Sequence, residues 1–399
     1  MDQRYDILIS GGGVAGLTAA CVMGAAAFSV LCVDPAPPVT DGGAEGADLR
    51  TTAFLQPARS LLEEAGLWAR LDPHAAALQI MRIVDAGGTE PTARLVRDFE
   101  ASDLGDLPFG WNLPNWLLRR EMLARIEELA NVTFRPGTGT ESLLTRETEA
   151  FVRLTDGSRI RTKLVLAADG RNSPMRQAAG IGAKTIRYGQ KALAFAVSHP
   201  VPHENVSTEV HRSGGPFTLV PLPDRDGGPC SAIVWMEDGA EVDRLAQLPV
   251  EAFEAAMMER STGILGPLTL LTRRSVWPII SQVADRMSGQ RVALMAEAAH
   301  VVPPIGAQGL NMSLGDLRCL RDLAVARPAG LGDRQMMEDY HRARHGEVTL
   351  RAAGIDMLNR ASQIHAQPLR DLRAATLGAL YGAAPVRRML MQMGLGAKG

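Results

Sequence analysis

Three glycines near the N-terminus constrain the fold more than any other feature of the sequence. Gly11, Gly13 and Gly16 follow an apolar segment, 5–9, that reads as a strand, and they open a run, 14–27, with helical character. In this Gly-x-Gly-x-x-Gly spacing the first glycine permits a tight turn, the second admits a pyrophosphate to the backbone, and the third lets the helix pack close to the strand. The pattern predicts a strand–turn–helix unit that binds phosphates at the helix N-terminus.

A carboxylate after the next predicted strand supports this interpretation. Residues 29–33 read as a strand that ends at Asp34, where a carboxylate can accept hydrogen bonds from a ribose diol. A chance glycine turn would also give the spacing, so the prediction depends on the strand, helix, second strand and acid occurring together. The loop by itself does not distinguish NAD from FAD.

The composition excludes several classes of function. Lys and Arg total 42 against 44 for Asp and Glu, so no overall electrostatic field would draw the protein to nucleic acid. The four cysteines are scattered along the chain, without the spacing of a disulfide pair or of metal ligands; they are Cys21, Cys32, Cys230 and Cys319. We therefore interpret them as core residues in a reducing compartment, which predicts a cytoplasmic protein without a metal site.

The rest of the chain alternates between helical and strand-like patterns. Helices are predicted over 51–71, 116–129 and 309–323 and for most of the chain after 335. Strands are predicted over 164–168 and 291–296, and short strands over 186–278. A hairpin with its turn at Asp156-Gly157 is predicted over 151–161. Because apolar strand plus helix returns after the β-rich part, we expect a discontinuous first domain with a β-rich domain inserted.

Three downstream stretches indicate which nucleotide is bound. They are Asp48 to Ala53, Leu164 to Arg176 with its Asp169-Gly170 pair, and Arg291 to Asn311, in which a strand delivers an acid, a proline turn follows and a helix opens. With the glycine loop, these stretches resemble the flavoprotein aromatic hydroxylases of the para-hydroxybenzoate hydroxylase class, particularly the ubiquinone-biosynthesis hydroxylases. The resemblance implies FAD as the bound nucleotide.

The resemblance also implies the architecture. The expected fold class is α/β, with a Rossmann-like FAD-binding domain of the glutathione-reductase type, an inserted β-sheet substrate domain and a helical C-terminus. The expected division is 1–72, 112–182 and 285–345 for the FAD-binding domain, 73–111 and 183–284 for the substrate domain, and 346–399 for the C-terminal helical region.

Individual residues acquire roles from the same resemblance. Arg50 lies at an expected helix start, where the resemblance places its forked guanidinium near the adenosine and pyrophosphate. The ordinary alternative is an exposed arginine in the first turn of a helix. The helix opening at Gly306 would direct its partial positive charge at the flavin pyrimidine ring and stabilise the anionic reduced flavin. The implied cofactor-binding residues are Gly11, Gly13, Gly16, Asp34, Arg50, Asn115, Arg119, Asp169, Gly170, Glu297, Gly306, Gln308, Gly309 and Asn311.

One position departs from the family pattern. Where the family usually has Gly-Asp, with the Asp holding the ribityl hydroxyls, this chain has Ala296-Glu297. Glu297 keeps the carboxylate but is one methylene longer, and Ala296 adds a methyl group at a close approach. We expect FAD binding to be retained with altered geometry.

The chemistry implied by the resemblance needs no nucleophilic side chain. NAD(P)H reduces FAD, O2 then gives a C4a-hydroperoxyflavin, and an electron-rich phenolic ring attacks its distal oxygen, as in monooxygenases of the EC 1.14.13 type. A second glycine-rich fingerprint is missing from the sequence, so NAD(P)H is expected to bind transiently. His300 and the Pro304 backbone are candidates for a catalytic role, although a histidine after a strand more often satisfies local packing.

The substrate side is predicted from the β-rich insert and from the C-terminal tail. Candidates for lining the pocket are Phe217, Leu219, Pro221 and Trp235, although alternating apolar residues in a sheet are usually core. Basic residues beside Leu and Met over 357–393 suit peripheral contact with the inner membrane or with a ubiquinone-biosynthesis complex, or simply a packed terminal helix. The substrate is expected to be an aromatic, prenylated small molecule; a soluble phenolic substrate and a non-catalytic scaffold with a degenerate flavin site are the alternatives.

Overall fold

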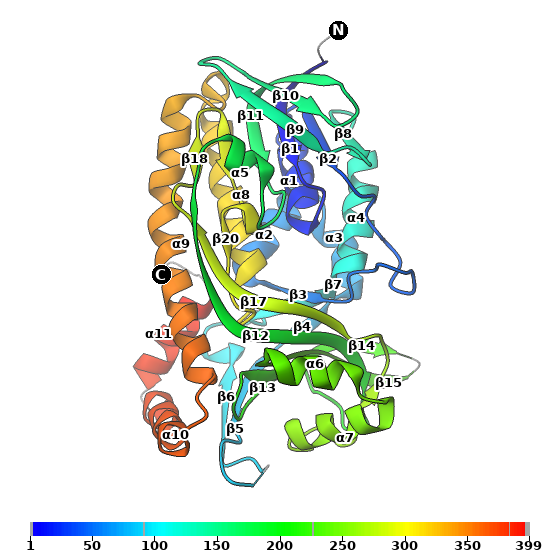
Figure 1. The fold of residues 1–399 in the computed structure, drawn as a ribbon, viewed down its shortest axis with the longest axis vertical. Coiled ribbons are helices and arrows are strands. Elements are labelled where there is room, and N and C mark those ends of the chain that lie inside the picture. Colours follow the sequence, from blue (N-terminus) through cyan, green and yellow to red (C-terminus); the bar gives the residue numbers. More distant parts are fainter. Residues whose placement is uncertain (1–2, 91, 226, 383, 396–399) are drawn as a thin grey trace.

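The computed structural model describes residues 3–395 apart from 91, 226 and 383, and it confirms an α/β fold built on three sheets. Figure 1 shows the first sheet in the upper half of the molecule and the second sheet crossing below it. The strands of the first sheet are β1 (Gln3–Ser10), β2 (Val30–Asp34), β8 (Val132–Pro136), β9 (Thr140–Thr145), β10 (Ala150–Leu154), β11 (Arg159–Ala167), β18 (Ser288–Gly289) and β19 (Val292–Leu294).

The middle of this sheet is parallel, in the order β19-β11-β1-β2-β8. Ile7, Leu8 and Ile9 in β1 are successive residues and all fully buried, so both faces of the strand are covered. The helices that pack around the sheet include α1 (Val14–Ala25), α4 (Asn115–Glu127), α5 (Pro174–Ala178), α8 (Gln308–Ala326) and α9 (Arg334–Ser362). Because β2 and β11 flank β1 on opposite sides, the carboxyl ends of these strands form the crevice where α/β sheets bind ligands.

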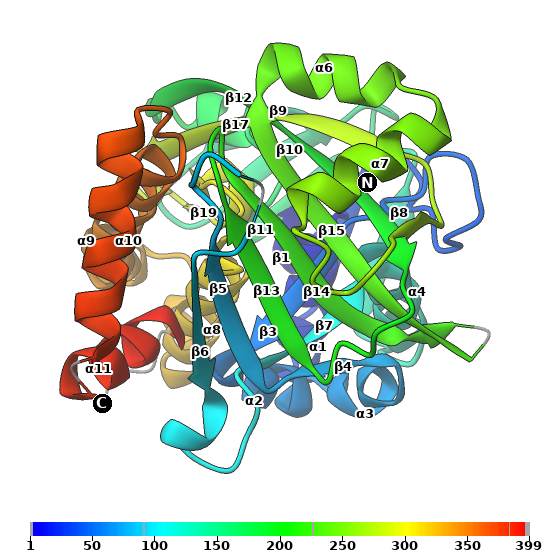
Figure 2. The same ribbon diagram turned by 90° about the horizontal axis from the view of Figure 1, so that it is seen from below.

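The second sheet is mostly antiparallel and has helices on one face. Its strands are β5 (Ile80–Asp85), β6 (Leu95–Glu100), β12 (Ala183–Ser198), β13 (Val206–His211), β14 (Pro216–Arg225), β15 (Gly228–Asp238), β16 (Thr269–Leu270), β17 (Ser275–Ala284) and β20 (His300–Val301). Figures 1 and 2 show α6 (Gly239–Gln247) and α7 (Val250–Arg260) on the face turned away from the first sheet. The strands are longer than the short ones predicted, and the two helices were not predicted.

The third sheet corrects one helix prediction. Residues 51–55 were expected to start a helix, but they form β3 (Thr51–Leu55), which pairs with β7 (Gly110–Pro114), and β7 pairs in turn with β4 (Ala76–Leu78). Phe54 is fully buried opposite Trp111, so a distant partner strand overrides local helical propensity. Helix begins only at α2 (Gln56–Glu64), followed by α3 (Trp68–Leu71).

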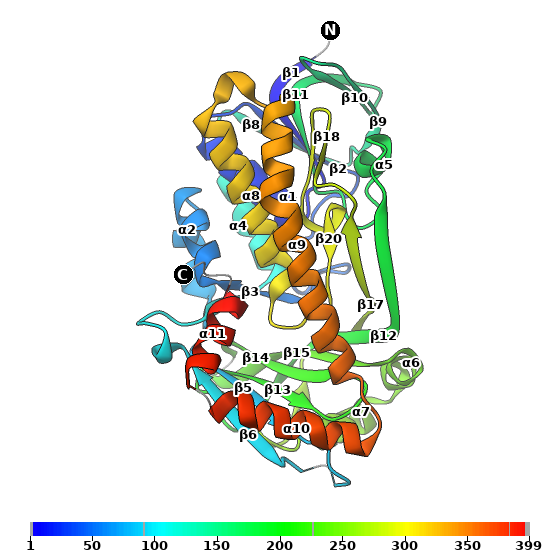
Figure 3. The same ribbon diagram turned by 90° about the vertical axis from the view of Figure 1, so that its left-hand side faces the viewer.

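The C-terminal part is helical, as predicted. After α9 come α10 (Gln367–Gly382) and α11 (Ala384–Leu395), and Figure 3 shows all three helices along one side of the molecule. Short 3₁₀ turns occur at Asp72–His74, Ala101–Asp103, Ala296–Ala298 and Pro328–Gly330. Over the described chain, no helix has the length and apolar character needed to cross a membrane.

Candidate functional site

The glycine loop adopts the close approaches that its spacing predicts. Gly11 has φ +106°, and a Cβ there would lie 2.4 Å from the carbonyl oxygen of Ala168. A Cβ on Gly16 would lie 1.8 Å from the carbonyl oxygen of Gly11. Any side chain at either position would push the first turn of α1 away from the end of β1.

Gly13 differs from these two because it faces open space. It is the N-cap of α1, and a Cβ added there would meet nothing within 4 Å. The free amides of the first helical turn therefore border an open volume, which suits a phosphate group.

Asp34 holds the loop in place. Its Oδ2 accepts a hydrogen bond from the Gly12 amide at 2.6 Å, and its Oδ1 accepts one from the Ala36 amide at 2.9 Å. Each carboxylate oxygen retains a second lone pair for a ribose hydroxyl. Asp34 is thus a positioning residue for the glycine loop as well as a candidate ribose ligand.

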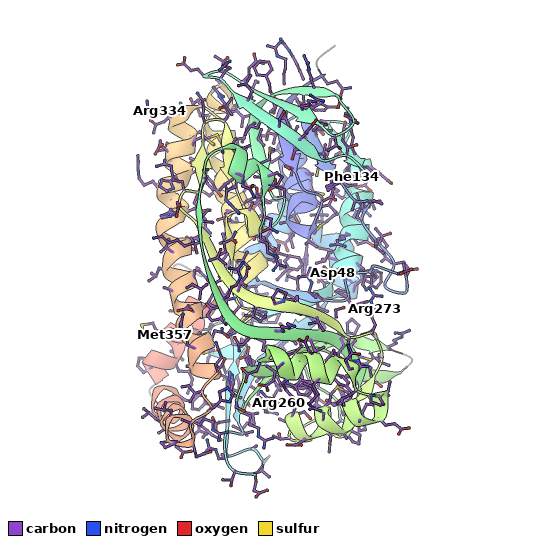
Figure 4. The ribbon with its side chains drawn as sticks, viewed as in Figure 1. Asp48, Phe134, Arg260, Arg273, Arg334 and Met357 are labelled. Carbon is purple, nitrogen blue, oxygen red and sulfur yellow. The ribbon has the colours of Figure 1, made fainter. Side chains whose placement is uncertain are left out.

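Asp48 gathers three of the predicted cofactor residues. Arg50 donates to it through Nε and Nη2, both at 2.8 Å, Asn115 donates through Nδ2 at 3.0 Å, and Arg119 lies 3.6 Å away. Burial would raise the pKa of Asp48, but the bonds from Arg50 and Asn115 outweigh it and lower the pKa below its usual value. Figure 4 shows Asp48 near the start of α4, beside the third sheet.

The two arginines retain donors for a ligand. Arg119 Nε is buried without a hydrogen-bond partner among the described residues, and the Arg50 guanidinium is partly exposed over the ring of Trp277, 5.8 Å from its centroid. A buried, unused guanidinium N–H is costly unless a ligand accepts from it. Both side chains therefore fit the phosphates of a dinucleotide.

Asp169 follows β11 at the same crevice. Its Oδ2 accepts from Ser10 Oγ at 3.2 Å and from the Met175 amide at 3.1 Å, while its Oδ1 is buried with no partner in the described chain. Burial raises the pKa of Asp169 despite these bonds. Gly170 has φ +83° and open space at its Cβ position. An unused acceptor beside an open backbone fits a ligand that donates hydroxyl groups, as the ribityl chain of FAD does.

The structure explains why Ala296 is unusual. Ala296 has φ +54°, in the left-handed region where glycine is favoured, which accounts for the glycine that the related hydroxylases usually have there. Glu297 follows on the exposed side, with 48% of its side chain accessible and Arg171 Nε 3.8 Å away. The carboxylate therefore sits in solvent beside a cation, available to a ligand.

The start of α8 is pinned by Asn311. Its Oδ1 accepts from the Leu55 amide at 2.9 Å, and its Nδ2 donates to the carbonyls of Ala53 at 2.8 Å and Ala307 at 2.6 Å. Asn311 thus ties the helix N-terminus to β3 and is a positioning residue.

Two glycines and a glutamine complete this helix start. Gly306 has φ +62°, and Gly309 has open space at its Cβ position. Gln308 donates to the carbonyl of Gly394 in α11 at 2.8 Å. The helix start therefore presents amides to open space and contacts the C-terminal helix.

The structure does not support a catalytic role for His300. Its Nε2 lies 2.6 Å from Asp316 Oδ2, both side chains are almost fully buried, and Arg344 Nε donates to the other oxygen of Asp316 at 2.8 Å. The imidazole is therefore held inside a buried charge network that joins α8 and α9. Pro304 is half-buried in the turn before α8, so its backbone stays a candidate.

Three of the predicted substrate-lining residues lie on the face of the second sheet that α6 and α7 cover. Phe217, Leu219 and Trp235 pack with α6 and α7 in a second core, and the rings of Phe217 and Trp235 meet edge to face at 5.2 Å. Pro221 is buried, and its carbonyl accepts from Asn112 Nδ2 at 2.9 Å. The strands alternate as predicted, and the face that carries Phe217, Leu219 and Trp235 is packed as core.

The opposite face carries a pair that the sequence did not reveal. Val210 belongs to the second core, so its neighbours Glu209 and His211 point to the other face, the one whose Met236 packs with the core of the first sheet. His211 Nε2 lies 3.3 Å from Glu209 Oε2, and both side chains are half-buried. From the sequence alone, two polar residues at positions i and i+2 of a strand are expected to face solvent. The pairing of the strands shows instead that Glu209 and His211 lie on the face that carries Met236.

Comparisons with known proteins identify the family of the chain. A family model described as an FAD binding domain matches residues 4–351. Ubiquinone hydroxylase UbiL of Rhodospirillum rubrum is 32% identical over 398 residues, which cover 99% of this chain and 90% of that protein. The chain belongs to this family. It is an FAD-dependent aromatic monooxygenase with NAD(P)H and O2 as co-substrates.

A second curated protein and a solved structure are also similar to this monooxygenase. The 3-demethoxyubiquinol 3-hydroxylase of Escherichia coli is 26% identical over 402 residues, which cover 99% of both chains. Among solved structures, p-nitrophenol 4-monooxygenase PnpA from Pseudomonas putida superposes with a TM-score of 0.80 over 100% of both chains at 18% identity. The latter likeness shows that the fold is the one used by flavoprotein monooxygenases.

Proposed function

We propose that this monooxygenase hydroxylates the aromatic ring of a polyprenylated phenol during ubiquinone biosynthesis. The observation that carries the proposal is the similarity to UbiL, named a ubiquinone hydroxylase, which extends over 99% of the chain rather than over the cofactor motifs alone. A second relative, 3-demethoxyubiquinol 3-hydroxylase, matches over the same length.

The cofactor residues divide into two groups with different tasks. The amides after Gly13, with Arg50 and Arg119, are proposed to bind the pyrophosphate, and Asp34 the ribose. Asp169 and Glu297 are proposed to accept hydrogen bonds from the ribityl hydroxyls, and the start of α8 to face the flavin ring. FAD supplies the oxygen-activating chemistry when it is bound and reduced; the chain supplies orientation and excludes water.

The substrate is proposed to lie against the face of the second sheet that carries His211. Backed by Glu209 at 3.3 Å, a neutral His211 can accept the proton of a phenolic hydroxyl, because the carboxylate stabilises the imidazolium that forms. Loss of that proton makes the ring more electron-rich and so more reactive towards an electrophilic oxygen.

Contact with a lipid bilayer is proposed for the C-terminal helices. Leu350 and Met357 in α9 are 76% and 67% exposed, and with Leu358 they fall at helix spacings that share one face. Leu369 and Leu372 in α10 are also exposed. Exposed apolar side chains on neighbouring helices suit shallow insertion at a membrane surface, where a polyprenylated phenol resides.

Profiling of quinone intermediates after gene deletion tests the substrate. We expect one underhydroxylated prenylphenol to accumulate, and restoration of the normal profile by the wild-type gene but not by an Asp169→Ala variant that fails to retain FAD. An unchanged quinone profile would exclude this substrate class and leave a soluble phenol. A purified protein that is colourless and takes up no added FAD would instead favour the scaffold alternative.

A further inference from the structure

A cavity lies on the face of the second sheet that α6 and α7 cover, turned away from the first sheet. It has a volume of about 360 Å³ and is bordered by β15, α6, α7 and the start of α10. Trp235 and Glu237, two residues apart in β15, both line it, so they share the face that carries the second core. Figure 4 shows Arg260 in this region beside α6 and α7. We call this cavity the arginine groove.

The arginine groove has an excess of positive charge. Four arginines and three glutamates line it, which gives a net charge of +1 when all are ionised. The residues are Arg212, Arg244, Arg260, Arg370, Glu237, Glu241 and Glu259. When Glu237 is protonated the net charge is +2, so the groove suits an anion in either state of Glu237, and a phosphate dianion would also meet the carboxylates of Glu241 and Glu259.

Most of the lining charges already have partners. Arg212 pairs with Glu259 at 2.7 Å, and Arg244 pairs with Glu241 at 2.6 Å. Arg370 differs, since its guanidinium donates to the Gln367 side chain at 2.5 Å while its Nε is buried without a partner in the described chain. Arg370 therefore has N–H groups left for a carboxylate.

Two donors on β15 complement Arg370. Trp235 is only 4% exposed, and its indole Nε1 has no hydrogen-bond partner among the residues described. Burial raises the pKa of Glu237 to about 7, with Arg260 at 4.0 Å lowering it in part. At neutral pH a large share of Glu237 is protonated and can donate an O–H bond to an anion.

The apolar part of the lining suggests the rest of the ligand. Leu245 of α6 and Ala256 of α7 border the groove together with Trp235. Leu245 and Trp235 are only 1% and 4% exposed, so a flat ring would rest on the edge of this cluster. The volume lies at the small end of the range for ligand pockets, about 300 to 1,000 Å³.

We propose that the arginine groove binds a monoanionic, single-ring aromatic carboxylate, with the carboxylate held by Arg370 and the Trp235 indole N–H. The ligand lies across the sheet from the face assigned to the substrate, so it does not compete with the substrate. It joins α10 to the substrate sheet, because Arg370 belongs to α10 and Trp235 to β15.

Fluorine NMR of the FAD-loaded protein labelled with 5-fluorotryptophan tests this site with benzoate as the probe. The chain has five tryptophans, and the Trp235 resonance is assigned by its loss in Trp235→Phe. We expect benzoate to shift the Trp235 resonance saturably. In Arg370→Gln, half of the shift should need about tenfold more benzoate, since one charge-assisted hydrogen bond is worth about that factor.

Matched probes and a control variant complete the test. Arg342→Gln, an equivalent change at a 76% exposed side chain of α9, should titrate as the wild type does. Benzyl alcohol and inorganic phosphate should leave the Trp235 resonance in place at the same concentrations. A benzoate shift confined to Trp277, near Arg50, would place the probe at the flavin site and overturn the proposal. It would also be overturned by equal titration of Arg370→Gln and wild type, or by an equal response to phosphate.

Discussion

Replacing Ala296 with glycine separates the cost of its backbone conformation from its effect on FAD. At φ +54°, an L-residue costs about 1–2 kcal/mol relative to glycine. Against this gain, glycine makes the unfolded chain more flexible, at about 0.4–1 kcal/mol, and the buried methyl group of Ala296 is lost, at about 0.8 kcal/mol. These terms nearly cancel, so the free energy of unfolding of the FAD-free protein should change by less than about 1 kcal/mol.

The affinity for FAD should respond more clearly. Without the methyl group the backbone can approach the cofactor as in the related hydroxylases, and we expect the FAD dissociation constant of Ala296→Gly to fall about fivefold, which corresponds to about 1 kcal/mol. Flavin fluorescence quenching measures the constant, and urea unfolding of the FAD-free protein measures stability. Ala296→Ser, which keeps a Cβ, is the control and should bind FAD as the wild type does. Unchanged or weaker binding by the glycine variant would show that the methyl group does not face the cofactor.

Four further substitutions test the flavin site, the substrate face and the arginine groove. Asp34→Ala removes two hydrogen bonds from backbone amides to a carboxylate and should weaken FAD binding at least tenfold in equilibrium dialysis. Wild-type affinity in this variant would show that the glycine loop does not need Asp34 to bind FAD. Asn311→Ala removes three bonds at the start of α8 and should lower stability by about 2–3 kcal/mol in urea; a loss below about 0.5 kcal/mol contradicts a positioning role. His211→Gln should lower kcat about 100-fold at neutral pH, with recovery at high pH where the phenol ionises in solution; a uniform loss at all pH values argues against proton acceptance. Burial raises the pKa of Glu237 from 4.5 to about 7, so the protonated side chain stabilises the fold fully below pH 4.5, and this stabilisation is lost as the pH rises through 7. Between pH 4.5 and 8 the free energy of unfolding of the wild type should therefore fall by about 3 kcal/mol relative to that of Glu237→Gln. Urea-unfolding profiles that stay parallel over this pH range would refute the shift.

The dinucleotide end of the site could be predicted because its determinants are local. Gly11, Gly16 and Asp34 fall within one strand–helix–strand unit, and each fulfils a geometric need that the spacing alone implies. The Asp48 cluster was predicted only through resemblance, and its local structure was predicted wrongly. Residues 51–55 form a strand because β7 lies beside them, and a pairing partner almost sixty residues away leaves no trace in local helical periodicity.

The substrate side could not be predicted for a different reason. Alternation in β14 correctly separates two faces, but a period of two does not say which face meets the helices and which meets the ligand. The choice is made by α6 and α7, whose positions were not predicted and whose side chains fill the second core with Phe217 and Trp235. Once that face is assigned, Glu209 and His211 follow on the other face without further assumptions.

The proposed flavin end of the site has a backbone with several positive φ angles, which no sequence motif predicts. Seven non-glycine residues of the described chain have positive φ; two of them, Ala296 and Ala307, lie in the segment that leads from β19 to α8, and a third, Arg291, directly precedes β19. Strain of this kind persists only where neighbouring contacts determine the backbone. Arg291 donates to the carbonyls of Glu147 and Leu331 at one end of the segment, and Asn311 holds the other end. Contacts within the protein therefore hold both ends of the segment, and if FAD binds at the start of α8, as proposed, these contacts reduce the free energy that binding must spend on ordering the segment.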